Sequence, residues 1–523
     1  MVADVDVLVV GAGPTGLLLA AELVRRGVGC LLIDEHDRPL SWDRATVVHP
    51  RSVEIFDALG LAGPLLEAGV RQRMARIHSD GAVLGEIDLA LSGSRFPFNV
   101  GVSEEVTEGI LTRHLEGFGG RVTRGTRLVG LEEQDEQVMA TVRDKAGERT
   151  LAARWVVGCD GHHSLVRTLA GIEQDGHAIE EPWAVFDAAI DGWPHSHEGN
   201  FAYFDSPPII LTALPGQRWR VYVRPSAENS DLVADASLTL KRYLPDAAFS
   251  AIANPVRFHC YSRVARQYRA GRLLLAGDAA HTCSPLQGHG MNTGLQDAFN
   301  LGWKLALVSS GHCAETLLDS YEAERRPVAQ KVTDMGDEMD RAQLFLDAGQ
   351  RLQRDAAIRG ALSDPVTRHQ EATAEAELDI DYRSSPIVIG SASDAGVGAG
   401  ALWPHHPPAA GHAGPDMIAA RAGHMAVLVA GAACAPESLA DLQRAVARHV
   451  GGAIVEMGFT LSAHGTHVDG SDGLDPALAE RLGVEGLALF IVRPDGYLGL
   501  RADERQSEAL ASYVAALGAT SPA

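Results

Sequence analysis

The sequence predicts an α/β protein that combines a parallel-sheet domain, a β-rich insertion and a small C-terminal α/β domain. Residues 5–10 (VDVLVV) form a run that is apolar except for Asp6, and a glycine-rich turn, a helical pattern and a second apolar run at residues 28–33 follow it. Residues 183–223 instead alternate apolar and polar positions, and short strand and helix patterns alternate again after residue 400. These three observations decide the fold class.

The N-terminal elements form a predicted βαβ unit. A run rich in β-branched apolar residues is typical of a strand covered on both faces. Residues 17–26 have helical spacing and end before Gly27, as a helix followed by a tight turn does. Two parallel strands joined by a helix imply a right-handed crossover. Residues 153–157 and 272–275 are further short, apolar strand candidates.

The middle of the chain has a different pattern. The alternation in residues 183–223, with its prolines, glycines and aromatic residues, predicts an antiparallel sheet with one solvated or ligand-facing side. Helices are predicted at residues 294–307 and 317–335, and a polar helix at residues 337–377. We expect a first domain in two parts, residues 1–175 and 271–395, a β-rich domain at residues 176–270, and a tail domain at residues 400–523.

The tail begins after a predicted linker. Residues 396–414 are rich in Gly, Ala, Pro and His, which is typical of an irregular connection. Strands are then predicted at residues 425–429, 453–455, 487–492 and 497–501, and helices at residues 439–449 and 504–517. This number of elements suits a small α/β domain.

Composition excludes several classes of function. The net charge of −23 argues against nucleic acid and anionic membranes, which would repel the protein. The apolar N-terminal segment is interrupted by its glycine-rich turn and lacks a basic start, so it predicts neither a signal peptide nor a membrane span, and we expect a cytoplasmic protein. The six cysteines are scattered without a CxxC pair, which disfavours disulfides and zinc; no metal site is expected.

The turn at residues 11–16 (GAGPTG) matches GxGxxG between a strand and a helix. Gly11 permits the tight turn, Gly13 lets the backbone approach a pyrophosphate, and Gly16 lets the helix pack against the strand. The helix N-terminus supplies unpaired N–H groups and a partial positive charge to phosphates. We therefore expect this turn, Thr15 included, to bind a dinucleotide, in a domain of Rossmann type. The turn alone does not separate FAD from NAD.

An acidic residue stands where the same motif places one. Asp34 ends the second predicted strand, 18 residues after Gly16, near the position of the acid that binds a ribose 2′-hydroxyl. Glu35 follows it immediately, so the role falls to either carboxylate or to both.

Two further clusters follow strand candidates. The first is residues 158–167 (GCDGHHSLVR), which contains Asp160 and Arg167. The second begins at residues 277–281 (GDAAH) and continues through Pro285, Gly288, Gly290, Met291, Asn292, Gly294 and Asp297. Together with the first turn, these clusters resemble the three fingerprints of the 4-hydroxybenzoate hydroxylase-like flavoprotein monooxygenases, in the family's order and over roughly residues 4–330.

The resemblance implies FAD as the cofactor and a role for each cluster. Asp278 is expected to accept a hydrogen bond from a ribityl hydroxyl. Gly290, Met291 and Asn292 open a helix whose N–H groups and dipole face the flavin pyrimidine ring, which stabilises negative charge there. Pro285 belongs to the same cofactor-binding cluster. Asp160 is expected to orient flavin or nicotinamide.

Other positions match the family less closely. Arg167 either contacts a phosphate or braces its turn. Arg44 matches an arginine that the family places near FAD. Glu104 is expected at the cofactor, although the family usually has Gln there, and Glu35 stands where the family often has Arg or Lys.

The resemblance also implies a reaction. NADPH or NADH reduces FAD, O2 adds to the flavin as a C4a-hydroperoxide, and its distal oxygen passes to an electron-rich aromatic ring. The chain contains a single GxGxxG, which fits hydroxylases, since disulfide-reductase flavoproteins carry a second dinucleotide domain. None of the seven tryptophans lies in the WxWxIP motif of flavin-dependent halogenases.

The substrate side is predicted in less detail. We expect residues 183–223 to form the substrate wall, and core packing is the equal alternative for its aromatic residues Phe201, Tyr203, Phe204, Trp219 and Tyr222. His49 and Arg224 are weaker polar candidates at the substrate. We find no catalytic triad, and His281 is expected to be a turn residue.

The tail resembles the thioredoxin-like C-terminal domain of phenol hydroxylases and aromatic polyketide hydroxylases. Residues 493–498 (RPDGYL) are similar to a recurrent hairpin of that domain, with an Asp-Gly turn. Cys434 stands alone, so the tail is expected to be structural rather than redox-active.

The overall resemblance favours hydroxylation of an aromatic polyketide in antibiotic biosynthesis, by a monomer or homodimer. Hydroxylation of a small phenol such as a hydroxyphenylpropionate, Baeyer–Villiger oxidation, antibiotic inactivation and non-catalytic flavin-based redox sensing stay open as alternatives.

Overall fold

The first sheet is built on the predicted βαβ unit. In the computed structural model, β1 (Val5–Val10) lies between β11 (Gly147–Gly158) and β2 (Cys30–Ile33), parallel to both, with Val7 opposite Trp155 and Cys30. The sheet order is β19-β20-β11-β1-β2-β8, and β10 and β9 extend it from β11. The other bounds are β8 (Val122–Thr123), β9 (Arg127–Gln134), β10 (Gln137–Asp144), β19 (Arg269–Ala270) and β20 (Leu273–Leu275).

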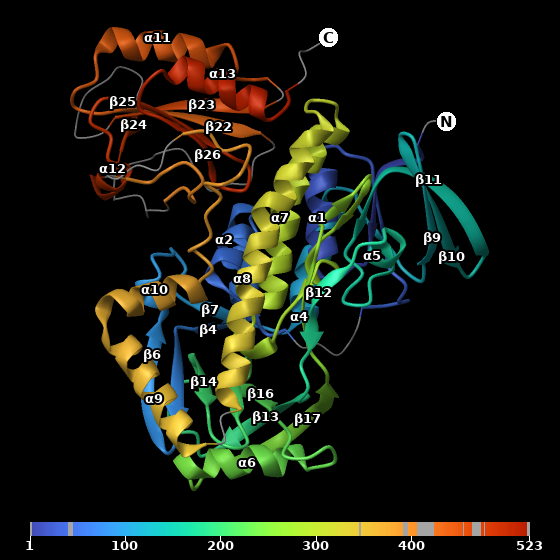
Figure 1. Cartoon of the computed structure of the whole chain (residues 1–523), viewed down its shortest axis with the longest axis vertical. Helices are drawn as coiled ribbons and strands as arrows, with labels where there is room; N and C mark the ends of the chain where they lie inside the picture. The colour runs from blue at the N-terminus through green and yellow to red at the C-terminus, as the bar shows by residue number, and fades with distance from the viewer. Residues whose placement is uncertain are drawn as a thin grey trace.

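Long helices cover this sheet (Figure 1). The helix α1 (Pro14–Arg25) packs against α7 (His289–Ser309) and α4 (Glu104–Gly117). The helix α7 is buried over nearly its whole length, as expected for an element between two layers. The structure describes residues 3–39, 45–344, 347–390, 396–404, 423–452, 454–462, 472–474 and 476–519.

The second sheet is the predicted β-rich layer, and it is larger than the alternation suggested. Its order is β17-β13-β16-β15-β14-β5-β6. The strands are β5 (Met74–Ser79), β6 (Ala82–Asp88), β13 (Trp183–Asp191), β14 (Gly199–Tyr203), β15 (Ile209–Leu214), β16 (Arg218–Val223) and β17 (Ala248–Phe258). The pair β5–β6 comes from outside residues 176–270 and joins β14 in parallel. The domain boundaries themselves stay a prediction.

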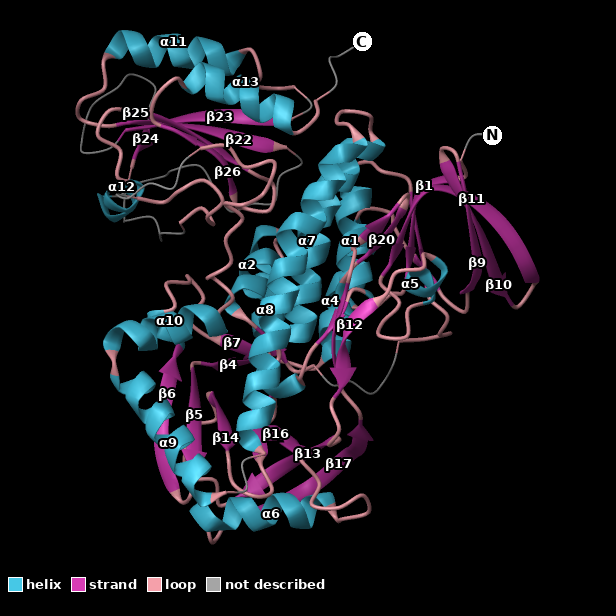
Figure 2. Cartoon of the chain, viewed as in Figure 1, coloured by secondary structure: helices cyan, strands magenta, loops and turns pink. Residues whose placement is uncertain are grey.

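Each face of this sheet has its own partner. Phe201, Trp219 and Val221 point to a core shared with α6 (Leu232–Tyr243). The alternate residues point to the opposite side, towards α8 (Asp319–Gln343) and the first sheet. Figure 2 shows α6 beneath the sheet and α8 above it.

The single polar helix predicted at residues 337–377 is wrong. After α8, the chain forms α9 (Ala348–Ser363) and α10 (Pro365–Glu375). Asp347 and Asp364 cap the two N-termini, with the Asp364 side chain accepting from the Thr367 N–H. Asp at an N-cap followed by Pro at the first helical position is a strong start signal, and it breaks the helix there.

In the described part of the tail, five strands form a sheet in the order β24-β23-β22-β25-β26. Its elements are β22 (His424–Ala430), α11 (Pro436–Ala447), β23 (Val455–Ser462), β24 (Asp472–Gly473), α12 (Pro476–Leu482), β25 (Leu487–Val492), β26 (Leu498–Ala502) and α13 (Gln506–Ala516). The strand predicted at residues 453–455 overlaps β23 only at Val455, where β23 begins and runs forward, and Ala453 lies outside the described residues. Residues 405–414 of the predicted linker lie outside the described residues.

Short elements complete the chain. They are β3 (Val47–Val48), α2 (Pro50–Ala58), α3 (Ala62–Ala68), β4 (Val70–Gln72), β7 (Asn99–Gly101), α5 (Leu165–Leu169), β12 (Gln174–Ala178), β18 (Tyr261–Ala265) and β21 (His281–Thr282). The α/β fold class is confirmed. Over the described part of the chain, no helix combines the length and the apolar character that crossing a membrane requires.

A buried ionic cluster joins the tail to the first domain. Glu324 of α8 binds both terminal nitrogens of Arg493 at 2.8 Å and the Lys304 ammonium of α7 at 2.7 Å. Asp495 accepts from the Trp303 indole at 3.0 Å and from Arg493. All five side chains are at most 2% exposed, so tail and domain share one interior.

Candidate functional site

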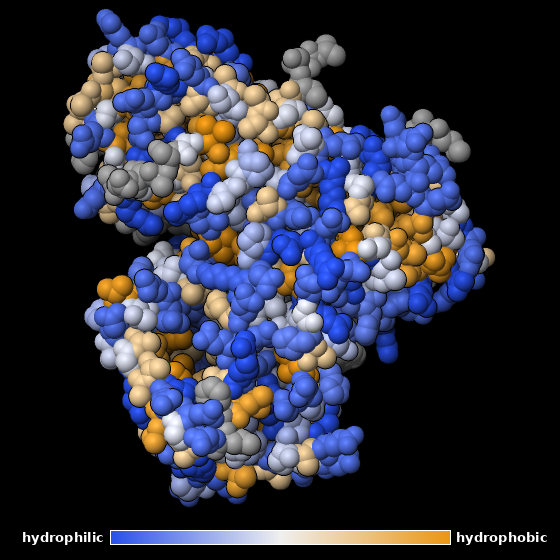
Figure 3. All heavy atoms as spheres, in the orientation of Figure 1, coloured by the Kyte–Doolittle hydropathy of each residue, from blue (hydrophilic) through white to orange (hydrophobic). Residues whose placement is uncertain are grey.

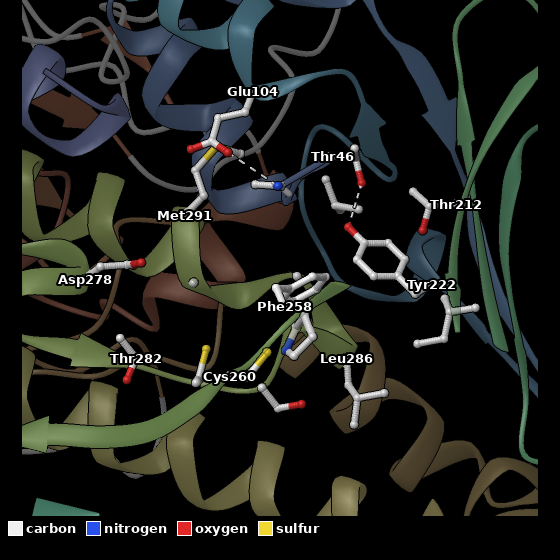
Figure 4. Close-up of a pocket in the computed structure, with 18 of the residues that line it drawn as sticks. Thr46, Glu104, Thr212, Tyr222, Phe258, Cys260, Asp278, Thr282, Leu286 and Met291 are labelled. Atoms are coloured by element: carbon white, nitrogen blue, oxygen red, sulfur yellow. Dashed lines mark hydrogen bonds between the residues drawn. The ribbon is translucent and has the colours of Figure 1, made fainter. Parts of the chain in front are cut away.

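One pocket lies where the three motif clusters and the second sheet meet. It encloses about 380 Å³. Figure 4 shows Asp278 and Thr282 on one side of it and Tyr222 and Thr212 on the other, with Met291 and Glu104 above. Figure 3 shows the mixed polar and apolar outer surface of the same face of the molecule as Figure 1.

The glycines of the first turn have different surroundings. Gly11 has φ +101°, and a Cβ there would lie 2.3 Å from the Cys159 carbonyl oxygen. A Cβ at Gly16 would lie 2.0 Å from the Gly11 carbonyl oxygen. A Cβ at Gly13 would meet nothing within 4 Å. Gly11 and Gly16 therefore allow close packing, whereas Gly13 borders open space in the pocket.

Thr15 connects the first and third clusters. It lines the pocket, and its hydroxyl would be 2.7 Å from a Cβ at Gly277 and 2.4 Å from a Cβ at Gly294. Glycine at position 294 therefore lets α7 approach α1 this closely, and glycine at position 277 does the same for the turn after β20. The role of Thr15 in binding the cofactor stays a prediction.

The two acidic residues after β2 lie apart from the pocket walls. Asp34 accepts from the Ala12 N–H at 2.8 Å and from the His36 N–H at 2.9 Å. Glu35 is exposed and faces Arg127, with 3.5 Å between its carboxylate and the guanidinium. Asp34 thus supports the glycine turn directly, and the ribose role of either residue stays a prediction.

Asp160 points away from the pocket and caps a helix. Its carboxylate accepts from the Ser164 hydroxyl at 2.5 Å and from the N–H groups of Leu165 and Val166 at 2.7 and 3.1 Å. Burial raises the pKa of this carboxyl. These bonds occupy the side chain at the start of α5, and contact with flavin or nicotinamide stays a prediction.

Arg167 braces the second cluster against the third. Its terminal nitrogens donate to the carbonyl oxygens of Ala279 and His162, each at 2.8 Å. Of the two roles left open by the sequence, this geometry supports the structural one.

In the third cluster, Asp278 is exposed towards the pocket, as Figure 4 shows. Pro285, Gly290 and Met291 also line it. Gly288 has φ +72° and starts α7 without a side-chain cap, so the first-turn N–H groups have no helical partner.

The Asn292 side chain holds the start of α7 in place. Its amide nitrogen donates to the carbonyl oxygens of Val47 and Gly288 at 2.9 and 2.8 Å, and its oxygen accepts from the His49 N–H at 2.9 Å. The side chain is fully buried. Only its backbone is left for the predicted cofactor contact.

Sequence reasoning missed a network behind the third cluster. Asp297 accepts from the Gly277 N–H at 3.1 Å, from His281 Nε2 at 2.7 Å and from Arg325 Nε at 2.7 Å. Arg325 also donates to the Tyr382 hydroxyl at 2.9 Å. These ion pairs hold the pKa of Asp297 below its ordinary value, although burial opposes them. His281 is therefore a buried partner of Asp297, not simply a turn residue.

The second sheet supplies the other wall. Its pocket-facing residues are Ala75, Ile77, Ile87, Asn200, Ala202, Ile210, Thr212, Tyr222 and Phe258. The Tyr222 hydroxyl lies 3.2 Å from the Thr46 hydroxyl, which links β16 to the segment before β3 (Figure 4). Of the five predicted aromatic residues, Phe204 and Tyr222 line the pocket.

For the other three aromatic residues, the structure supports core packing, the second of the two alternatives that the sequence left open. Phe201, Tyr203 and Trp219 lie in the core beneath the sheet, because strand alternation places them on the α6 side. Reasoning from the sequence also missed lining residues from outside residues 183–223, namely Phe258, His259, Cys260, Leu286, Met339 and Glu375. Their sequence surroundings carry no distinguishing pattern.

Neither weak polar candidate is among the residues that line the pocket. Arg224 is buried, binds Asp340, and lies with its guanidinium carbon 4.7 Å from the Trp183 ring centre. His49 is fully buried below Gly288. The prediction that these two side chains contact the substrate has no support in this geometry.

His49 belongs to a buried cluster with His289 and Glu377, whose ligand-type atoms lie within 4.8 Å of one another. His289 Nδ1 lies 2.7 Å from Glu377 Oε1, which is a hydrogen-bond distance. Burial raises the pKa of Glu377 to about 7. The cluster has the residue types of a metal site, but this short contact favours a shared proton.

Two predicted cofactor residues remain. Glu104 lines the pocket and accepts from the Ala45 N–H at 3.4 Å. Arg44 lies outside the described residues.

The pocket fits a dinucleotide in three respects. Open space adjoins Gly13, the helices α1 and α7 both start at the pocket without side-chain caps, and Asp278 is exposed there. Uncapped helix N-termini favour the phosphates and electronegative edges of such a molecule.

Comparisons with known proteins agree with this fit. A family model described as "FAD binding domain" matches residues 4–336. The chain is 31% identical to 6-methylpretetramide 4-monooxygenase of Streptomyces rimosus, over 98% of this chain and 93% of that protein. It is 35% identical to pentachlorophenol 4-monooxygenase of Sphingobium chlorophenolicum, over 64% of each chain.

Solved structures resemble the whole fold. An anhydrotetracycline hydroxylase from Streptomyces rimosus has a TM-score of 0.75 and 28% identity, covering 99% of this chain and 100% of that one. An aklavinone-11 hydroxylase in complex with FAD and aklavinone has a TM-score of 0.76 and 24% identity, covering 99% of each. The matched family and the near full-length relative show that this chain belongs to the FAD-binding family of flavin-dependent aromatic monooxygenases.

Proposed function

We propose that the protein hydroxylates a neutral, multi-ring aromatic compound of polyketide type, with NADPH or NADH and O2 as co-substrates. The composition of the pocket wall carries this proposal. Apolar and aromatic side chains from both sides, such as Ile77, Ile210 and Phe258, suit fused rings. No lysine or arginine is among the described residues that line the pocket.

Charge in the pocket supports a neutral substrate. Glu375 lines it apart from the acidic residues expected at FAD, so a substrate carboxylate beside Glu375 would meet like charge in a region of low dielectric. A hydroxyphenylpropionate carries such a carboxylate. The wall therefore favours multi-ring phenols over the small-phenol alternative.

FAD, when bound, supplies the electron transfer from NAD(P)H and the activation of O2. The chain supplies the rest. The turn at Gly13 would hold the pyrophosphate, Asp278 a ribityl hydroxyl, and the first-turn N–H groups at Gly290 and Met291 the pyrimidine edge, where negative charge develops.

The remaining tasks fall to the substrate wall. The apolar residues exclude water from the reacting ring. The Tyr222 hydroxyl, paired with Thr46, can orient a phenol and hold a proton at its oxygen. Holding the ring in a fixed orientation lowers the entropic part of the barrier.

The proposal is tested by turnover of the purified holoenzyme. NADPH and NADH oxidation is followed with aklavinone, anhydrotetracycline, pentachlorophenol or 3-(3-hydroxyphenyl)propionate, under 18O2. We expect the two multi-ring phenols to stimulate oxidation and to gain one 18O atom as a new hydroxyl.

Other outcomes separate the alternatives. Stimulation by the single-ring compounds alone supports small-phenol hydroxylation. Insertion of the 18O atom into a ring supports Baeyer–Villiger oxidation, and a product that has lost antibacterial activity supports antibiotic inactivation. Bound FAD without stimulation by any compound supports a redox sensor. The cytoplasmic location and the monomeric or homodimeric state stay predictions.

A further inference from the structure

The pocket-facing side of the second sheet carries two adjacent rows of side chains. Strand register defines them, because residues directly opposite on neighbouring strands share a face. The first row is Tyr222, Ile210, Ala202 and Ile77. The second row is Asp187, Arg220, Thr212, Asn200 and Ala75. Polar residues are thus concentrated in the second row.

Part of the second row is already neutralised. Arg220 binds Asp187 through two bonds, Nε to Oδ1 at 2.7 Å and a terminal nitrogen to Oδ2 at 3.0 Å. Neither residue is among those that line the pocket. Thr212 and Asn200, which are direct partners on β15 and β14, do line it.

A chain of hydrogen bonds fixes the Asn200 amide. Its nitrogen donates to Gln72 Oε1 at 3.0 Å, and the Gln72 amide nitrogen donates to the Ala213 carbonyl oxygen at 2.8 Å. Gln72 is fully buried. Since a carbonyl can only accept, the bond to Ala213 sets the orientation of Gln72, and Gln72 in turn sets that of Asn200.

This orientation leaves an acceptor without a partner. Asn200 Oδ1 is buried and makes no hydrogen bond within the described part of the chain. Buried acceptors in folded proteins are nearly always paired. A Cβ at Gly101 would lie 2.1 Å from the Gln72 amide nitrogen and 2.2 Å from the Ala213 oxygen. Glycine at position 101 therefore leaves room for the hydrogen bond between Gln72 and Ala213.

We propose that Asn200 and Thr212 determine specificity by binding a hydrogen-bond donor, a hydroxyl or carboxamide, on the substrate ring distant from the flavin. The ribityl chain of FAD is expected beside Asp278. Figure 4 shows Thr212 on the opposite side of the pocket from Asp278. The inference rests on the proposed function, and it adds which substituent the multi-ring substrate carries and where.

Two ligands that differ at one end test it. 2,6-Dihydroxyanthraquinone has a hydroxyl at each end, and 2-hydroxyanthraquinone has only one. Each is titrated into the FAD-loaded protein, and the change in flavin absorbance gives Kd. We expect the dihydroxy ligand to bind about tenfold more tightly to the wild type, as one added hydrogen bond in a buried site predicts.

Two variants test whether Thr212 and Asn200 cause the preference for the dihydroxy ligand. Thr212→Val keeps the shape of the side chain and removes its hydroxyl, and Asn200→Leu removes the acceptor. We expect each to reduce the tenfold preference to about twofold, with Kd for 2-hydroxyanthraquinone and FAD content unchanged. Thr150→Val, on the exposed part of β11, is the control and keeps the preference.

A tenfold preference that persists in both variants overturns the inference while leaving the proposed function standing. Equal affinity of the wild type for the two ligands also overturns it. If neither ligand alters the flavin spectrum of the wild type, the multi-ring substrate class fails, and the inference fails with it. Should Asn200→Leu not fold, Thr212→Val alone decides.

Discussion

At the first turn, two glycines serve different physical purposes. Gly11 has a positive φ and would place a Cβ 2.3 Å from the Cys159 carbonyl oxygen, whereas a Cβ at Gly13 would point into open space. We expect Gly11→Ala to destabilise the protein without ligand by about 2 kcal/mol or more, from backbone strain and overlap. Urea unfolding of the protein stripped of FAD measures this.

Gly13→Ala is the matched variant. We expect it to leave unfolding of the FAD-free protein unchanged and to weaken FAD binding about tenfold, because its methyl group occupies the space needed by the pyrophosphate. Fluorescence titration with FAD measures the affinity. Equal effects of the two variants on both readouts would contradict this division of roles.

Glu377 makes stability depend on pH. Burial raises its pKa to about 7 from the ordinary 4.5, so the folded protein binds this proton more tightly than the unfolded chain. Glu377 favours the folded state most below pH 4.5, where it is protonated in both states. As pH rises from 4.5 to 7 the unfolded chain loses this proton first, so the free energy of unfolding falls, and above pH 7 it is lower by about 3 kcal/mol.

Glu377→Gln carries no such charge. We therefore expect the wild type to lose stability relative to this variant between pH 5 and pH 8, by an amount on the order of 3 kcal/mol. Thermal unfolding at both pH values measures the difference, and Glu136→Gln, in an exposed turn, is the control. A difference that does not change with pH would refute the assignment.

The sequence could predict which motifs meet, but not how each side chain is used. Strand–turn–helix order is local, so the positions of Gly13, Asp278 and Met291 at one pocket follow from the motif spacing. Asp160 and Asn292 belong to the same motifs, yet their side chains cap or fasten backbone. Whether such a side chain faces the pocket or binds backbone groups depends on its rotamer and on partners from distant segments.

At the scale of elements, the start of α7 depends on one amide. Asn292 pairs three backbone groups, from Val47, His49 and Gly288, and its bond to the His49 N–H is buried. We expect Asn292→Ala to cost about 2–3 kcal/mol, since three backbone bonds are lost and the buried His49 N–H is left without a partner. FAD affinity should also fall, because the helix start that faces the pocket is released. Urea unfolding and FAD titration measure the two effects.

Asn300→Ala supplies the comparison on the same helix. Asn300 bonds Glu324 and Asp495 far from the pocket, so we expect a loss of stability without a loss of FAD affinity. If both variants weaken FAD equally, the N-terminal turn has no special role.

Element prediction succeeded where patterns are local and failed where partners are distant. The residues of β25 coincide with the predicted strand, because LALFIV is apolar throughout. Nothing in residues 74–88 indicated that β5 would join β14 in parallel. Likewise Phe201 and Asn200 are neighbours on β14, and only the placement of α6 decides which of them faces the core.

On the scale of the whole molecule, the tail is held by charge in the interior. Arg493 lies between Glu324 of α8 and Asp495 of its own hairpin, and its guanidinium carbon is 5.2 Å from the Trp303 ring centre. The sequence indicated a hairpin at residues 493–498, but Glu324 and Trp303, which Arg493 also contacts, stand far away in the chain. Although burial raises the pKa of Glu324, the charges of Arg493 and Lys304 hold it far below its ordinary value.

Breaking this cluster should therefore affect both parts of the chain together. Arg493→Met removes the charge that two buried carboxylates share, and we expect a loss of about 3–5 kcal/mol. Arg444→Met breaks an exposed pair with Asp441 on α11, and we expect little change, since surface pairs contribute little. The measurement is urea unfolding followed by both flavin fluorescence and circular dichroism. If the tail is part of one interior, the two signals shift together in Arg493→Met.

A flavin transition that stays at the wild-type midpoint while circular dichroism shifts would instead mean that the tail unfolds by itself, and that its contact with α7 and α8 does not support the flavin site.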